Sequence, residues 1–279
     1  MTLDVPGVRR VTLVVDVEAY SLRDNRAQVE LQQTLLWTLE RACTRAGVGV
    51  KQCLRQDRGD GQLVILPPGI DESRQLPLLL RGTHAALHRA NQVPGIAGRM
   101  RLRAALSQGI VHRAATGFVG RSVVHACRLL DSAVLHEVLD DHEDTDLALI
   151  VSDDLYTDVF SHGYGDTAPD AFQRVDVTVP AKRFAAPAWV HVPGPATGAV
   201  LREAERLPPP GRGPRTGPVL AAFAGAAAGA GLVEAAITAL NWPADDTAED
   251  PDGHHDHHHD DDPFDDVFTD YSDWDDPVY

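Results

Sequence analysis

The feature that most constrains the fold of this chain is a short apolar run that leads to an aspartate. Val11–Val17 is largely apolar and rich in β-branched residues, with Asp16 near its end, which predicts a buried strand that opens into a loop. A second aspartate, Asp60, lies in a Gly-Asp-Gly turn between two strand-like segments, Gly49–Gln56 and Gln62–Leu66. This pattern predicts a hairpin, and a strand that ends in Asp beside that hairpin brings two carboxylates together.

Two clustered carboxylates are the ligands that a hard divalent cation prefers. Mg²⁺ and Mn²⁺ bind carboxylate oxygens, and phosphates bind those cations in turn. A single aspartate is usually a turn residue or a helix cap. The pair of Asp16 and Asp60 instead favours a metal site. Glu18 and Asp57 flank these two positions, and we expect both to be solvated.

Predicted strands and helices alternate along the first 193 residues. Asp24 is expected to cap a helix that Gly47 ends, and Glu72–Asn91 predicts a second helix, interrupted near Pro77. Further predicted elements are strands around 100–106 and at Ile110–Arg113, a helix at Gly120–Asp131, a strand at Leu147–Val151, a helix from Ser152 to Gly163, and strands at 175–179 and Ala188–Val192. The order β-α-β-β-α-β-β-α-β-α-β-β predicts an α/β sandwich, with helices expected over one face of a mixed sheet.

Charge is distributed unevenly along the chain. The net charge is −16, and residues 243–279 hold 15 acids and no Lys or Arg. The other residues have 41 − 15 = 26 acids against 25 bases, so they lack the basic signature of nucleic-acid binding. We expect a folded domain at 1–193, a Pro/Gly-rich linker at 194–216 with a short helix near Ala199–Leu207, and a disordered Asp/His-rich tail at 243–279.

An apolar segment, Gly217–Trp242, lies between the linker and the tail. As a helix it is long enough for the ~30 Å hydrocarbon core of a bilayer, and Arg212 and Arg215 before it would put its N-terminal side in the cytoplasm. Glu234 and the many Ala and Gly residues weaken insertion. A membrane tether and an Ala-rich amphipathic or disordered segment therefore both stay open.

Cysteine usage points to a reducing compartment. Cys43, Cys53 and Cys127 are odd in number and have no metal-binding spacing, so we expect reduced core residues of a cytosolic domain. The N-terminal residues show no secretory signal.

Three segments together resemble the catalytic domain of class III nucleotidyl cyclases, the adenylate and guanylate cyclases. Val15–Ser21 (VDVEAYS) is similar to the first metal motif of that family, and Arg58–Gly61 (RGDG) is similar to the second. Gly120–Leu130 (GRSVVHACRLL) is similar to the helix that bears transition-state residues. The resemblance covers roughly residues 8–193 and implies a ferredoxin-like βαββαβ core. The stretch Asp57–Gly61, followed by an apolar strand and Pro67-Pro68, looks like a divergent actinobacterial branch.

The resemblance also implies a division of roles. Asp16 and Asp60 match the residues that hold two Mg²⁺ or Mn²⁺ ions, and Arg128 matches the arginine that stabilises charge on the transferring phosphoryl group. The loop residues Val17, Glu18, Ala19, Tyr20 and Ser21 would offer backbone N–H groups to the triphosphate. In the family that arginine reaches across a head-to-tail dimer, so a nucleoside triphosphate and a second copy of the chain are the implied partners.

Several positions depart from the family pattern. Gln56 and Gly117 stand where base-selecting residues are expected, and Val124 replaces the asparagine that orients the ribose. Ala19 replaces a usual glycine, which is a milder change.

Three functions remain open from the sequence. The first is a nucleotide-signalling protein that binds a metal–nucleoside triphosphate as a dimer, with weak or lost cyclisation. The second is an active cyclase that makes a 3′,5′-cyclic nucleotide with unusual base selection through Gln56. The third is a membrane-tethered adaptor or effector that uses the fold only for oligomerisation.

Overall fold

A computed structural model of the chain describes residues 6–165 and 167–211. The apolar segment 217–242 and the acidic tail 243–279 lie outside these residues. Within the described part of the chain, no helix combines the length and the apolarity needed to cross a bilayer.

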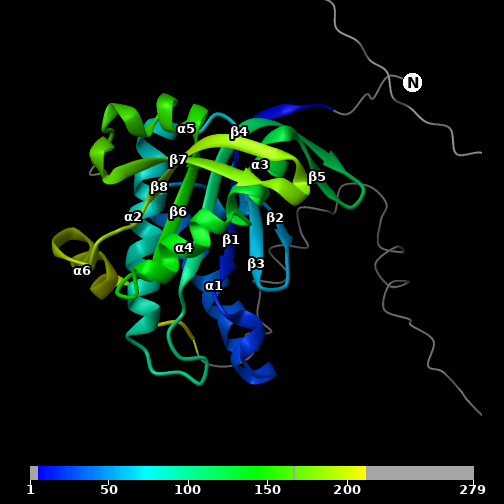
Figure 1. Cartoon of the computed structure of the whole chain (residues 1–279). Helices are drawn as coiled ribbons and strands as arrows, with labels where there is room; N and C mark the ends of the chain where they lie inside the picture. Colours follow the sequence, from blue (N-terminus) through cyan, green and yellow to red (C-terminus); the bar gives the residue numbers. More distant parts are fainter. Residues whose placement is uncertain (1–5, 166, 212–279) are drawn as a thin grey trace, which may run out of the picture. The chain divides into compact units, whose positions relative to one another are not determined.

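The described residues form one mixed eight-stranded sheet with helices, as the sequence predicts. The strands are β1 (Val8–Val17), β2 (Leu54–Asp57), β3 (Gly61–Ile65), β4 (Leu102–Ala114), β5 (Gly117–Val119), β6 (Leu147–Ser152), β7 (Phe172–Val179) and β8 (Phe184–His191). The α-helices are α1 (Asn25–Ala46), α2 (Glu72–Asn91), α3 (Arg121–Leu130), α4 (Ala133–Asp141), α5 (Asp153–Asp158) and α6 (Gly198–Arg206). Figure 1 shows these elements in chain order.

The sheet has the order β2-β3-β1-β4-β6-β8-β7, and β5 extends from β4 as a hairpin. Among the strands of residues 6–211 that the structure describes, β4 and β6 form the one parallel pair. The first part of the chain, β1-α1-β2-β3-α2-β4, forms an antiparallel sheet in the order β4-β1-β3-β2, which is a ferredoxin-like βαββαβ arrangement. This topology puts β1, with Asp16 near its end, inside the sheet between β3 and β4.

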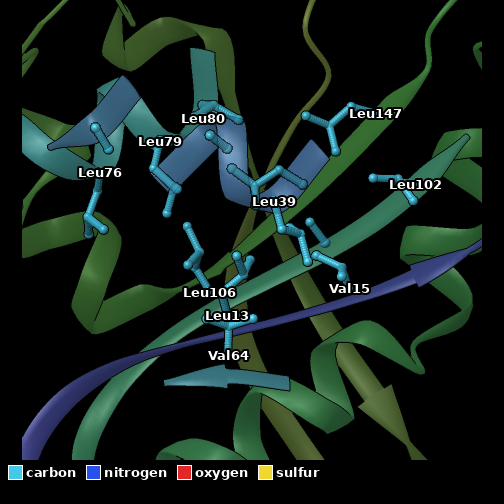
Figure 2. Close-up of a cluster of buried hydrophobic side chains, with 14 of the residues drawn as sticks. Leu13, Val15, Leu39, Val64, Leu76, Leu79, Leu80, Leu102, Leu106 and Leu147 are labelled. Carbon is cyan, nitrogen blue, oxygen red and sulfur yellow. The ribbon is translucent and has the colours of Figure 1, made fainter. Parts of the chain in front are cut away.

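Helices cover both faces of the sheet, and the expectation of a single covered face is wrong. On one face α1 and α2 pack over alternate residues of β1, β4 and β6, such as Leu13, Leu106 and Leu147 (Figure 2). On the other face α3 and α4 pack over the intervening residues, such as Val14 and Ala105. The central strands are therefore apolar on both sides, which explains why Val11–Val15 shows no polar alternation.

Local capping chemistry sets the ends of α1 as predicted. The Asp24 carboxylate accepts a hydrogen bond from Ala27 N–H at 2.8 Å, and Gly47 ends the helix with φ +70°, a conformation that favours glycine. In α2 the predicted interruption is absent, since the helix runs through Pro77. Proline removes one backbone donor near the start of α2, and the core contacts of Leu76, Leu79 and Leu80 hold the helix together.

Other boundaries differ from the predictions for identifiable reasons. The first half of Gly49–Gln56 is a 3-10 turn, because only its later residues, from Leu54 on, pair with β3. Ile110–Arg113 is not a separate strand but the continuation of β4, which pairs with β1 up to Val111. The helix after Ser152 ends at Asp158 and a 3-10 turn follows it. Helix α4 was not predicted, although Ser132 caps it through a hydrogen bond from Leu135 N–H.

Candidate functional site

The end of β1 and the β2–β3 turn are joined directly. Asp16 lies opposite Gly61 in the sheet, and Val17 N–H donates to the Asp60 carbonyl at 3.0 Å. A Cβ atom at Gly61 would lie 2.0 Å from the Val15 carbonyl oxygen, so the close approach of the turn to β1 requires glycine there. The structure thus brings the two predicted metal-binding aspartates, Asp16 and Asp60, to one place.

The Asp16 side chain is held by Arg103, which lies opposite it on β4. Arg103 donates from Nε to one carboxylate oxygen at 2.8 Å and from Nη2 to the other at 3.1 Å. Burial raises the pKa of the Asp16 carboxyl, the Arg103 guanidinium lowers this pKa in part, and the charge of Asp60 raises it further. Asp60 is therefore close enough to interact with Asp16 electrostatically.

His136 on α4 completes this network. Its Nδ1 lies 2.8 Å from Arg103 Nη1, and burial, together with the Arg103 charge, lowers the pKa of the imidazole. The ring is therefore neutral at pH 7, and Nδ1 accepts the hydrogen bond from Arg103.

A second carboxylate–arginine pair lies just beyond the ends of the same two strands, since Glu18 follows β1 and Arg101 precedes β4. Arg101 Nη1 donates to both carboxylate oxygens of Glu18, at 2.9 and 3.0 Å, so the expectation that Glu18 is solvated is wrong. Arg103 on β4 and Arg101 just before it are two residues apart and share one face, where each meets a carboxylate at the end of β1 or just after it. Asp57 is exposed, as expected, and accepts a hydrogen bond from Gln62 Nε2 at 2.8 Å.

The loop after β1 offers fewer backbone donors than predicted. Val17 N–H bonds the Asp60 carbonyl and Glu18 N–H bonds the Arg101 carbonyl, each at 3.0 Å. The N–H groups of Ala19, Tyr20 and Ser21 donate to no described residue. These three groups are the ones available to a phosphate.

Two features hold this loop in position. Ala19 has φ +53°, a left-handed conformation that favours the glycine which the family resemblance expects there. Gln32 on α1 donates from Nε2 to the Tyr20 hydroxyl at 2.9 Å and to the Gly59 carbonyl at 3.0 Å. Gln32 therefore links the loop to the β2–β3 turn.

The two positions expected to select a base also lie together. Gln56 on β2 covers Gly117 at the start of β5, because a Cβ atom at Gly117 would lie 2.3 Å from Gln56 Oε1. Gln56 is exposed, so its amide group is accessible from solvent.

Arg128 lies apart from the aspartates. Its Nη1 donates to the Lys182 carbonyl at 3.4 Å, and no hydrogen bond or ion pair joins it to Asp16 or Asp60 within the chain. Val124, one turn earlier on α3, is 52 % exposed and offers no polar group beside Arg128.

The residues fit a divalent cation only in part. Among the described residues, no group of three or more His, Cys, Asp or Glu side chains could hold a metal ion. Mg²⁺ is commonly held by one or two carboxylates together with substrate phosphates and water. Asp16 and Asp60 meet that requirement if a triphosphate supplies further oxygens and Arg103 releases Asp16.

Sequence reasoning missed Arg103, His136, Arg101 and Gln32. The alternation of Arg101 and Arg103 with apolar residues signals that both share one face of β4. Their partners, Asp16 on β1 and Glu18 just after it, follow only from the way β1 and β4 align.

No protein-family model matches the chain. No curated protein matches it either.

Similar solved structures are adenylate and guanylate cyclase domains. The guanylyl cyclase Cya2 is 16% identical over 68% of this chain and 96% of its own, with a TM-score of 0.47. The guanylate cyclase domain of RhGC from Catenaria anguillulae, in complex with GTP, is 15% identical over 66% of this chain and 97% of its own, with a TM-score of 0.44. An adenylate/guanylate cyclase/hydrolase from Silicibacter pomeroyi is 17% identical over 68% of this chain and 100% of its own, with a TM-score of 0.45.

Proposed function

We propose that this protein is a cyclase-homology nucleotide-signalling protein that binds a metal–nucleoside triphosphate at a dimer interface, with weak or absent cyclisation. The observation that carries the proposal is the junction of Asp16 and Asp60, made by the hydrogen bond from Val17 N–H to the Asp60 carbonyl. The N–H groups of Ala19, Tyr20 and Ser21, which have no acceptor among the described residues, lie in the loop after β1. Carboxylates for a cation beside N–H groups for an anion suit a metal-bound phosphate chain.

Each part of the site then has a defined task. Asp16 and Asp60 hold Mg²⁺ or Mn²⁺, and the Ala19–Ser21 backbone orients the phosphates. When bound, the metal neutralises phosphate charge and lowers the pKa of a ribose hydroxyl. Gln56 offers an amide group that can donate to or accept from a base edge.

Slow or absent cyclisation follows from two features. Val124 offers no polar group where the family resemblance expects an asparagine, and the loss of one preorganised contact typically costs ~10²–10³ in rate. Arg103 also neutralises Asp16, so a cation must compete with a guanidinium for this carboxylate.

A dimer is proposed because Arg128 has no contact with the aspartates of its own chain. In a head-to-tail pair, Arg128 of one copy faces Asp16 and Asp60 of the other. Exposed apolar side chains on β1, β4, β5 and α3 support such an interface, namely Val8, Ile110, Val119 and Val124. A specific interface of this kind buries over ~1,000 Å² in total.

The function is tested by incubating the full chain with each nucleoside triphosphate and Mn²⁺ and identifying products by mass spectrometry. We expect little or no cyclic nucleotide from the unmodified chain and an increase with Val124→Asn. Turnover by the unmodified chain at ordinary enzyme rates would refute lost cyclisation and favour an active cyclase with base selection through Gln56.

A second candidate is an adaptor that uses the fold only to oligomerise. It is favoured by the Asp16–Arg103 pair, because this pair satisfies the carboxylate without a metal. Absence of nucleotide binding together with a stable dimer would favour the adaptor.

The cellular context remains a proposal. We propose a cytoplasmic domain tethered through 217–242, supported by the apolar sequence and the preceding Arg212 and Arg215. In that case the full chain pellets with membranes and resists extraction by high salt, and a chain that stays in the supernatant refutes the tether. Membership of an actinobacterial branch is likewise proposed, from the Asp57–Gly61 stretch and Pro67-Pro68.

A further inference from the structure

A cavity on the outer side of the α1–α2 layer has five arginines among its ten lining residues. Its volume is about 500 Å³, and α1, α2 and α6 all contribute to its walls. The arginines that line it are Arg41, Arg45, Arg81, Arg202 and Arg206. Asp16 belongs to the opposite, α3–α4 side of the sheet, so this cavity is separate from the candidate nucleotide site.

A single carboxylate opposes this positive charge. Glu203 on α6 lines the cavity and forms ion pairs with Arg45 Nε at 2.8 Å and Arg81 Nε at 3.5 Å. Glu40 and Glu205 lie on the same helices but do not line the cavity. Five guanidinium groups therefore surround one carboxylate, and like charges at this density repel unless an anion is present.

Three of these arginines have no partner among the described residues. Arg41, Arg202 and Arg206 form no hydrogen bond or ion pair with any residue in the described part of the chain, and Arg41 Nε is shielded from solvent. A purely structural role, in which ion pairs hold α6 against α1 and α2, requires only Glu203, Arg45 and Arg81. Such a role does not explain why three further arginines line the same cavity.

We propose that this arginine cavity binds a phosphate-bearing anion. A guanidinium group is planar and always charged, and its donors match phosphate oxygens in pairs. Arg202 and Arg206 are one turn apart on α6 and Arg41 and Arg45 are one turn apart on α1, so two helices present paired donors to the same space. The phosphate belongs either to a soluble polyanion or to a lipid headgroup.

The test measures binding of inorganic triphosphate to the full chain by calorimetry, in EDTA at low salt. EDTA removes the divalent cation that the candidate nucleotide site requires, so the result does not depend on the proposed function. We expect one ion to bind per chain. The double variant Arg41→Gln/Arg206→Gln should bind about tenfold more weakly or worse, because each charged hydrogen bond lost costs at least that much. Neither arginine contributes to the Glu203 ion pairs, so α6 stays in place.

Arg174→Gln serves as the matched control, since Arg174 is an exposed arginine on β7 away from the cavity. It should bind like the unmodified chain, and circular dichroism checks that all variants are folded. Absence of binding by the unmodified chain, or equal binding by the double variant, would overturn the proposal.

Vesicles identify the source of the phosphate. Sedimentation with phosphatidylcholine vesicles that contain phosphatidylserine, reversed by triphosphate and weakened in the double variant, assigns a lipid headgroup. Triphosphate binding without such sedimentation assigns a soluble anion.

Discussion

Removal of the Arg103 side chain should destabilise the fold, because it leaves the Asp16 carboxylate without its ion-pair partner. Arg103 and Asp16 are only 14 % and 15 % exposed, and removing one partner of a buried ion pair typically costs 3–5 kcal/mol. Because both side chains retain some solvent contact, we expect Arg103→Met to lower the free energy of unfolding by about 2–4 kcal/mol at pH 7. Methionine keeps most of the apolar volume of the arginine side chain, so the loss of stability reflects the loss of the guanidinium charge.

The loss should shrink in acid. Burial already raises the pKa of Asp16, and Arg103 is the main influence that lowers it, so this pKa rises further in Arg103→Met. A carboxyl with a raised folded-state pKa destabilises the fold only in its charged form. The penalty is therefore absent below the unfolded value of about 3.9 and grows as the pH rises through the folded-state pKa.

Urea unfolding of both proteins at pH 7 and pH 4.5, followed by circular dichroism, measures this difference. Asp16→Asn/Arg103→Met is the control, because it removes the unpaired charge and should recover much of the lost stability. A change below about 0.5 kcal/mol at pH 7, or an equal loss at both pH values, would refute the role assigned to this pair.

Three further variants test the surroundings of the site. Ala19→Gly should raise the free energy of unfolding by about 0.5–1 kcal/mol, because Ala19 has φ +53°; an unchanged urea midpoint would contradict the strain. Gly61→Ala should cost about 3 kcal/mol or more, because the new Cβ would lie 2.0 Å from the Val15 carbonyl oxygen, and thermal unfolding measures the loss. Val119→Asp puts a charge on a side chain that is 59 % exposed, so it should leave the fold intact and shift sedimentation from dimer to monomer; equal sedimentation of both proteins would exclude Val119 from the interface.

The parts of the fold that local chemistry decides were predictable from the sequence. Asp24 and Gly47 set the limits of α1 through capping interactions within a few residues, and the glycines beside Asp60 specify a turn. The Asp16–Arg103 pair was not predictable, because its residues are 87 positions apart and meet only through the β1–β4 register. Helices on both faces were likewise missed, although the unbroken apolar run before Asp16 is typical of a strand buried on both sides.

Binding of a nucleoside triphosphate through Asp16 and Asp60 is the central claim, and calorimetric titration of the full chain with ATP or GTP in Mg²⁺ tests it most directly. We expect saturable binding that EDTA abolishes and that Asp60→Asn weakens at least about tenfold, the loss expected when a charged ligand is removed. Asp57→Asn is the matched control, because Asp57 is an exposed residue at the end of β2 beside the same turn, and among the described residues its carboxylate accepts a hydrogen bond only from Gln62; this variant should bind normally. Binding that survives EDTA, or that Asp57→Asn and Asp60→Asn weaken equally, would contradict the account, as would no binding at all.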